Sequence, residues 1–93
     1  MRYLPKLHQV NVFNEVIRSG SIRSAAKKMN LTQPALTRAL QELEHNMGAT
    51  LMIRSNEGVT LTEAGKSFAI RANLILSELE KAADEIEEIY KST

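Results

Sequence analysis

The stretch LTQPALTRALQELE, residues 31–44, contains the repeat that decides the fold. Leu36, Leu40 and Leu43 follow one another at spacings of four and three, which is the period of one face of an α-helix. Met47 continues the same spacing. We therefore expect a helix that buries this face against the rest of the chain.

The ends of this helix are marked by residues with known local roles. Thr32 can cap the helix start with its hydroxyl, and Pro34 fits the first turn because the first amides of a helix have no intrahelical acceptor. Gly48 is suited to end it. The sequence thus predicts a helix over about 33–47.

The opposite face of this helix is polar without being densely charged. At about 100° per residue it carries Gln33, Pro34, Thr37, Arg38 and Gln41. Gln can bond adenine and Arg can bond guanine through two hydrogen bonds in the major groove, whereas a solvated face more often carries Glu and Lys pairs. We interpret it as a face that contacts bases. An ordinary helical hairpin with incidental polar residues is the alternative.

Two shorter helices are expected before this one. The first has apolar residues at helical spacing, namely Leu7, Val10, Phe13, Val16 and Ile17. Ser21 can cap the second, whose apolar members are Ile22, Ala25, Ala26 and Met29. A tight turn at Asn30 and Leu31 then leads into the polar-faced helix, an order that predicts a helix-turn-helix.

A β-hairpin is expected after Gly48. Residues 51–54 (LMIR) and 59–62 (VTLT) flank a turn-forming segment. Two strands alone are marginal in water, so we expect Leu51, Ile53 and Leu61 to pack on the helices. The predicted fold class is mainly α, a winged helix-turn-helix of three helices and a two-stranded wing, followed by a long helix.

The long helix is expected from Thr62 to about Tyr90. Seven positions keep an unbroken heptad pattern: Phe68, Ala72, Ile75, Leu79, Ala82, Ile86 and Ile89. At about 1.5 Å per residue the helix is about 42 Å long, more than so small a body can cover. We expect this stripe to meet the same helix of another chain.

The composition restricts the class of function. The 93 residues include no cysteine, which excludes thiolate chemistry and agrees with a reducing compartment, so we expect a cytoplasmic protein. No apolar run is long enough to cross a membrane. Up to residue 73 there are ten Lys or Arg against five Asp or Glu, and afterwards two against six. A polyanion such as nucleic acid would therefore contact the first part.

No pattern of catalytic or metal-binding residues stands out. The two histidines lie on separate helices, and the four glycines form no phosphate-binding loop. The carboxylates between Glu78 and Glu88 spread around the helix and fit a solvated face. We expect no enzyme activity, no metal and no cofactor.

Taken together, the motifs resemble the DNA-binding segment of LysR-type transcriptional regulators. The resemblance begins near Leu7 and covers nearly the whole chain. It rests on Phe13, Gly20-Ser21, Ala25-Ala26, Thr32-Gln33-Pro34-Ala35, Leu43-Glu44, Gly48, Leu51, Arg54 and Leu61-Thr62-x-Ala64-Gly65. It implies a bacterial regulator whose N-terminal winged helix-turn-helix binds an interrupted inverted repeat.

The resemblance also implies roles for particular residues. Gln33, Pro34, Thr37 and Arg38 match major-groove contacts of the family, and Gln41 stands one turn further on. For phosphates we expect Ser21, Ser24 and Thr32 at helix starts, Lys27 and Lys28 as cations, and Arg54 at the base of the wing. Glu57 stands at the wing tip, where relatives have a second basic residue, so we expect no strong tip contact. Met52 replaces a usual phenylalanine, which we interpret as a packing change.

The family's architecture implies partners as well. It implies a DNA-binding domain over 1–61, a linker helix over 62–93 that forms an antiparallel homodimer, and a C-terminal effector-binding domain that this sequence lacks. We therefore expect a fragment of a longer chain, with higher oligomers only through that domain. The alternative function is a winged-helix interaction or dimerisation module that does not bind DNA.

Overall fold

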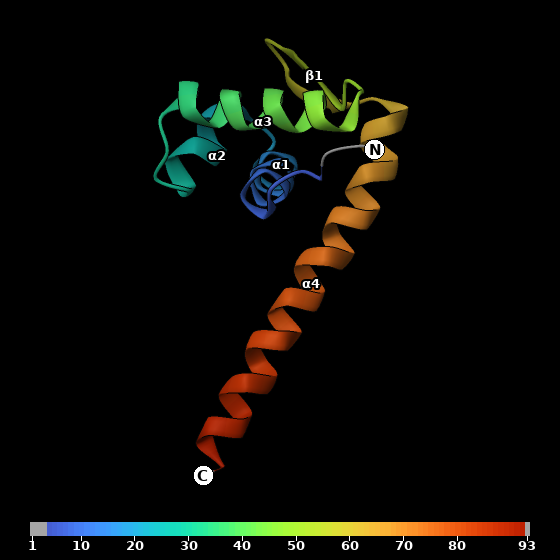
Figure 1. Cartoon of the computed structure of the whole chain (residues 1–93). Helices are drawn as coiled ribbons and strands as arrows, with labels where there is room; N and C mark the ends of the chain where they lie inside the picture. The colour runs from blue at the N-terminus through green and yellow to red at the C-terminus, as the bar shows by residue number, and fades with distance from the viewer. Residues whose placement is uncertain (1–3, 93) are drawn as a thin grey trace.

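The structure is a computed structural model that describes residues 4–92, and this part of the chain has four helices and one two-stranded sheet. The elements are α1 (Leu7–Ser19), α2 (Ile22–Lys28), α3 (Gln33–Met47), β1 (Met52–Ser55), β2 (Gly58–Leu61) and α4 (Glu63–Lys91). The first three helices and the hairpin form a body from which the far half of α4 projects (Figure 1). The predicted winged helix-turn-helix with a long final helix is confirmed.

The predicted helix ends are also found. The Ser21 hydroxyl accepts a hydrogen bond from the Ser24 amide at 3.1 Å, and the Thr32 hydroxyl accepts one from the Ala35 amide at 3.2 Å. Gly48 ends α3 with φ of 69°, a left-handed conformation that glycine adopts without strain. These local signals fix where α2 begins and where α3 begins and ends.

The core lies where α1 meets α2, α3 and the first half of α4. Its largest fully buried side chains are Phe13, Leu36, Leu43, Val12 and Val16. The leucine face of α3 is therefore buried as predicted, and its polar face is turned away from the core. This burial fixes the rotation of α3 about its axis.

The wing pairs β1 with β2 in antiparallel register, from Met52 opposite Leu61 to Ser55 opposite Gly58. The expectation that Ile53 packs on the helices was wrong, because its side chain is 55% exposed while Met52 is only 7% exposed. Neighbouring residues of a strand point to opposite faces, and the short sequence could not tell which face is inward. The Glu44 carboxylate of α3 accepts the amides of Leu51 (2.6 Å) and Met52 (3.2 Å).

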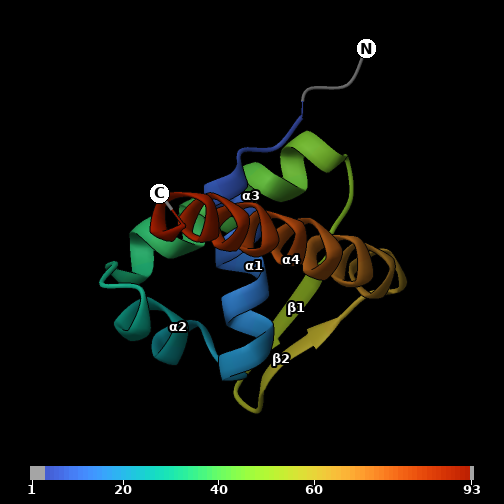
Figure 2. The ribbon, with the colours of Figure 1, turned by 90° about the horizontal axis from the view of Figure 1, so that it is seen from below.

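α4 starts in close contact with the end of the wing. The Thr62 hydroxyl donates to the carbonyl oxygens of Thr50 (2.7 Å) and Leu51 (3.2 Å) and accepts from the Gly65 amide (3.0 Å). A Cβ on Gly65 would overlap the Leu51 carbonyl, so only glycine fits there. From this point α4 runs across α1, as the view from below shows (Figure 2).

The first half of α4 belongs to the body. Phe68 packs edge-on against Phe13 with ring centroids 5.1 Å apart, and Ala72 is fully buried within this chain. The expectation that these two positions face another chain is corrected, because a heptad pattern does not tell an intrachain partner from an interchain one. The later apolar positions Ile75, Leu79, Ile86 and Ile89 are 42–61% exposed.

Candidate nucleic-acid interface

The outer face of α3 carries the side chains expected to contact bases. Gln33, Pro34, Arg38 and Gln41 are exposed, and Thr37 is half-buried between α3 and the wing. All five project from a helix whose other side is held by buried leucines. The fold therefore presents hydrogen-bond donors and acceptors on one rigid helix face.

A groove of about 330 Å³ separates this face from the wing. It is lined by residues from α2, α3 and both strands, among them Ser21, Arg23, Gln33, Thr37, Arg54 and Asn56. The Arg54 guanidinium donates from Nη1 to the Thr37 hydroxyl at 3.3 Å. This bond brings the predicted wing arginine directly beside the predicted base-contacting helix.

The hydroxyls at the helix starts can serve two partners. Ser21 and Thr32 use their oxygen atoms to accept backbone amides, and the hydroxyl hydrogen of each stays available as a donor. Ser24 is exposed in the first turn of α2. A phosphate oxygen at these positions would accept the hydroxyl hydrogens without breaking the caps.

The two lysines of α2 differ in their surroundings. Lys28 Nζ lies 3.8 Å from the Glu15 carboxylate of α1, which also accepts the Ser19 hydroxyl at 2.9 Å. Lys27 is exposed, and no carboxylate within the described chain forms an ion pair with it. Lys27 is therefore the better placed of the two to meet a phosphate, because the charge of Lys28 is partly offset by Glu15.

The wing tip is a two-residue turn of Asn56 and Glu57. The Ser55 hydroxyl accepts the Glu57 amide at 3.2 Å, which stabilises the turn. Glu57 is exposed at the end of the hairpin. Arg54 pairs with Val59, next to the last strand pair before this turn, so it lies near the tip and not at the base of the wing as expected. A carboxylate at the tip repels phosphates, so Arg54 is the cation that this hairpin offers to DNA.

Arg23 and the buried Gln9 are not among the residues that the sequence predicts for the site. Arg23 lines the same groove as Arg54, but nothing in its local sequence distinguishes it from other surface arginines. Gln9 is only 2% exposed, although glutamine is usually a surface residue. Both placements depend on contacts between elements that are distant along the chain.

Metal binding and membrane insertion are two other functions that the described residues can be checked for. Across residues 4–92, no three His, Asp or Glu side chains gather closely enough to hold a metal ion. Within the same range, no helix is both long enough and apolar enough to cross a membrane.

The fold and this interface define a winged helix-turn-helix DNA-binding domain. The sequence profile of the bacterial regulatory helix-turn-helix proteins of the lysR family matches residues 7–66. The chain belongs to this lysR family, as the sequence resemblance implied. It is a LysR-type DNA-binding domain and not an enzyme, in keeping with relatives that are transcriptional regulators.

One relative is the HTH-type transcriptional regulator TdcA of Escherichia coli K12, which is 47% identical over 83 residues. The match covers 89% of this chain and 27% of TdcA, so the chain spans about a quarter of that regulator's length.

Two solved structures show the same fold in complexes with DNA. The DNA-binding domain of CbnR bound to DNA is 33% identical with a TM-score of 0.82. The match covers 90% of this chain and 97% of the CbnR domain. The DNA-binding domain of BenM bound to benA site 1 DNA is 30% identical with a TM-score of 0.83. The match covers 90% of this chain and 98% of the BenM domain.

Proposed function

We propose that this domain binds an inverted-repeat operator as a homodimer, with α3 in the major groove of each half-site. The observation that carries the proposal is the polar face of α3, exposed beside an arginine of the wing that bonds Thr37 at 3.3 Å. The domain would act in the bacterial cytoplasm as the DNA-binding part of a transcriptional regulator.

The chemistry of the face fits base recognition. Gln33 and Gln41 can each bond an adenine, Arg38 can bond a guanine, and the Thr37 methyl can contact thymine. Pro34 adds apolar contact area. Ser21, Ser24, Thr32, Lys27, Lys28 and Arg54 would contact phosphates and fix the position of α3, which such contacts do without specifying sequence.

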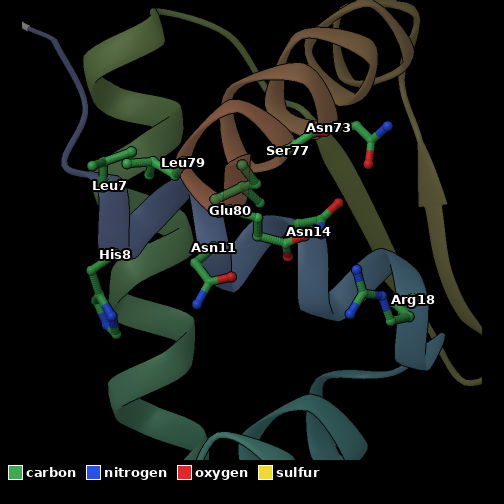
Figure 3. Close-up of a pocket in the computed structure, with 10 residues that line it drawn as sticks. Leu7, His8, Asn11, Asn14, Arg18, Asn73, Ser77, Leu79 and Glu80 are labelled. Atoms are coloured by element: carbon green, nitrogen blue, oxygen red, sulfur yellow. The ribbon is translucent and has the colours of Figure 1, made fainter. Parts of the chain in front are cut away.

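The far half of α4 supports a homodimer. Its apolar stripe of Ile75, Leu79, Ala82, Ile86 and Ile89 is exposed in this chain. The stripe is continuous with a groove of about 530 Å³ between α1 and α4. Figure 3 shows Leu7, Asn11 and Asn14 of α1 across that groove from Leu79 and Glu80 of α4. The α4 helix of a second chain, packed along the stripe, would cover both the stripe and the groove.

Charge favours an antiparallel pair of α4 helices. Residues 78–91 carry six carboxylates and two lysines, whereas the first part of α4 carries Lys66 and Arg71 against Glu63 alone. A parallel pair would bring two acidic ends together, and an antiparallel pair sets each beside the basic start of its partner. The two α3 helices would then meet half-sites about 34 Å apart, or a multiple of that distance.

Selection of bound duplexes from a random pool tests the base contacts. We expect the unchanged chain to enrich an inverted repeat, and Gln33→Ala to cost about 1–3 kcal/mol on the selected site and relax preference at one base pair. Arg38→Ala should do the same at a different base pair. Asn46→Ala, which removes an amide from the same helix about 140° away from Gln41, is the control and should keep the preference. Unchanged preference in both face variants would contradict the proposed role of α3.

The phosphate contact of Arg54 has a separate signature. Arg54→Ala should weaken binding to all duplexes alike and make the slope of log affinity against log salt shallower by about 0.9, the value for one phosphate. Lys81→Ala removes an equal charge from the far half of α4, where Lys81 pairs with Glu78 at 3.4 Å, and should keep the slope. Equal slopes for both variants and the unchanged chain would rule Arg54 out as a phosphate contact.

An interaction module without DNA binding is the second candidate. It would leave the polar face of α3 and the adjacent arginines without a partner, and no feature of the described residues favours it.

A further inference from the structure

Gln9 is a buried polar side chain that the proposed DNA contacts do not use. It stands in the first turn of α1 and is 2% exposed. Its amide makes two hydrogen bonds: Oε1 accepts the Lys6 backbone amide at 3.2 Å, and Nε2 donates to Glu42 Oε2 at 3.0 Å. Gln9 thus connects the start of α1 to the recognition helix α3.

The chemistry of its two partners fixes which way the Gln9 amide points. The Lys6 N–H can only donate, so it requires the carbonyl oxygen of Gln9. The Nε2 group is then left facing the Glu42 carboxylate, which can accept but not donate when ionised. If the amide were flipped, Gln9 Nε2 would face the Lys6 N–H, donor against donor, and Gln9 Oε1 would face the Glu42 carboxylate, acceptor against acceptor. The Gln9–Glu42 hydrogen bond therefore runs from Nε2 to the carboxylate.

Glu42 also stands one helical turn from Arg38. Residues four apart on a helix are neighbours, and an Arg and a Glu at this spacing are able to form an ion pair. Within residues 4–92, no ion pair joins Arg38 to Glu42, although both line one hollow with Gln9. The Glu42 oxygen is instead engaged by Gln9.

We propose that Gln9 is a positioning residue for DNA recognition: it holds the Glu42 carboxylate on the α1 side of α3 and so keeps the Arg38 guanidinium free for a base. This inference rests on the proposed contact of Arg38 with DNA. Without the Gln9 donor, Glu42 turns along α3 to pair with Arg38. The guanidinium must then break that pair before it can bond a guanine, and a carboxylate stands nearer the phosphates.

A double-mutant cycle between Gln9 and Glu42 tests the inference. Gln9→Met keeps the side-chain length and removes both hydrogen bonds. We expect it to lower affinity for the selected duplex about twofold, the scale of a competing helical ion pair, and to weaken preference at the base pair that Arg38 contacts. In a Glu42→Ala chain, the same Gln9→Met change should cost no affinity, because no carboxylate is left to release.

Gln9→Glu separates this role from capping of α1. The new carboxylate can still accept the Lys6 amide, so the cap survives, but it cannot donate to Glu42 and repels it. We expect a loss at least as large as that of Gln9→Met. A loss confined to Gln9→Met would identify the cap as the cause and overturn the inference.

The remaining outcomes distinguish the inference from the function on which it rests. If Arg38→Ala weakens specific binding but Gln9→Met costs the same in the unchanged and Glu42→Ala chains, only the role of Gln9 is refuted. If Arg38→Ala leaves binding and preference unchanged, the base contact fails and the inference fails with it. Thermal unfolding of each variant verifies that the folded chain is being compared.

Discussion

A chain carrying Leu79→Glu and Ile86→Glu is expected to be monomeric and to bind the inverted repeat at least about 100-fold more weakly than the unchanged chain. The two side chains are 46% and 57% exposed, so charge at these positions does not disturb the core of one chain. In a dimer both would be buried against the partner, where unpaired carboxylates are costly. A monomer also loses the effective concentration that links the two half-sites, which is worth about 10² to 10⁴ in affinity.

Sedimentation and a titration of half-site and full-site duplexes measure these two effects. Ile70→Glu is the matched control, because Ile70 is 65% exposed on the same helix and lies about 160° around it from Ile86. We expect the control to remain dimeric. Half-site affinity should be similar in all variants. A double variant that stays dimeric would show that the chains meet through another surface.

Gly65→Ala is expected to destabilise the fold by about 3 kcal/mol or more. Helix propensity alone predicts the opposite, a gain of about 1 kcal/mol, since Gly65 lies inside α4. The added methyl would overlap the Leu51 carbonyl where α4 meets the end of the wing, and overpacking against backbone has no flexible side chain to absorb it. For a domain of this size the melting temperature should fall by about 12 °C or more.

Gly48→Ala is the matched comparison for this effect. A methyl on Gly48 meets nothing within 4 Å, and its cost comes only from the left-handed backbone, with φ of 69°. That strain is about 1–2 kcal/mol. We expect Gly65→Ala to unfold at a lower temperature than Gly48→Ala. The reverse order would mean that α4 can shift away from the wing at little cost.

The elements could be predicted because their ends and buried faces are encoded locally. Thr32, Pro34 and Gly48 mark α3 without reference to the rest of the chain, and its leucines fix which face is buried. The polar face of α3 follows from the same periodicity. The candidate base contacts were therefore accessible from sequence.

Contacts between distant elements were not accessible in the same way. The heptad pattern of α4 runs unbroken through Phe68 and Ala72. Phe68 nevertheless packs on Phe13 of α1, and Ala72 is fully buried within the same chain. The spacing of apolar residues is the same in the buried and the exposed halves of the helix, so it does not show where the burial within one chain ends. Ile53 and Met52 are both apolar, so composition could not choose the inward face of β1. The proposed role of Gln9 depends on a bond to a residue 33 positions away.

The Thr62 hydroxyl has a mechanical consequence. It joins the end of the wing to the first turn of α4 through bonds of 2.7–3.2 Å, and the wing is joined to α3 through Glu44. α4, about 43 Å long, is therefore a lever arm held at two places, at the wing through Thr62 and at α1 through the packing of Phe68 on Phe13. If two such arms cross in the proposed dimer, a small change in their crossing angle would tilt each wing and its attached α3 together with α1, as one unit.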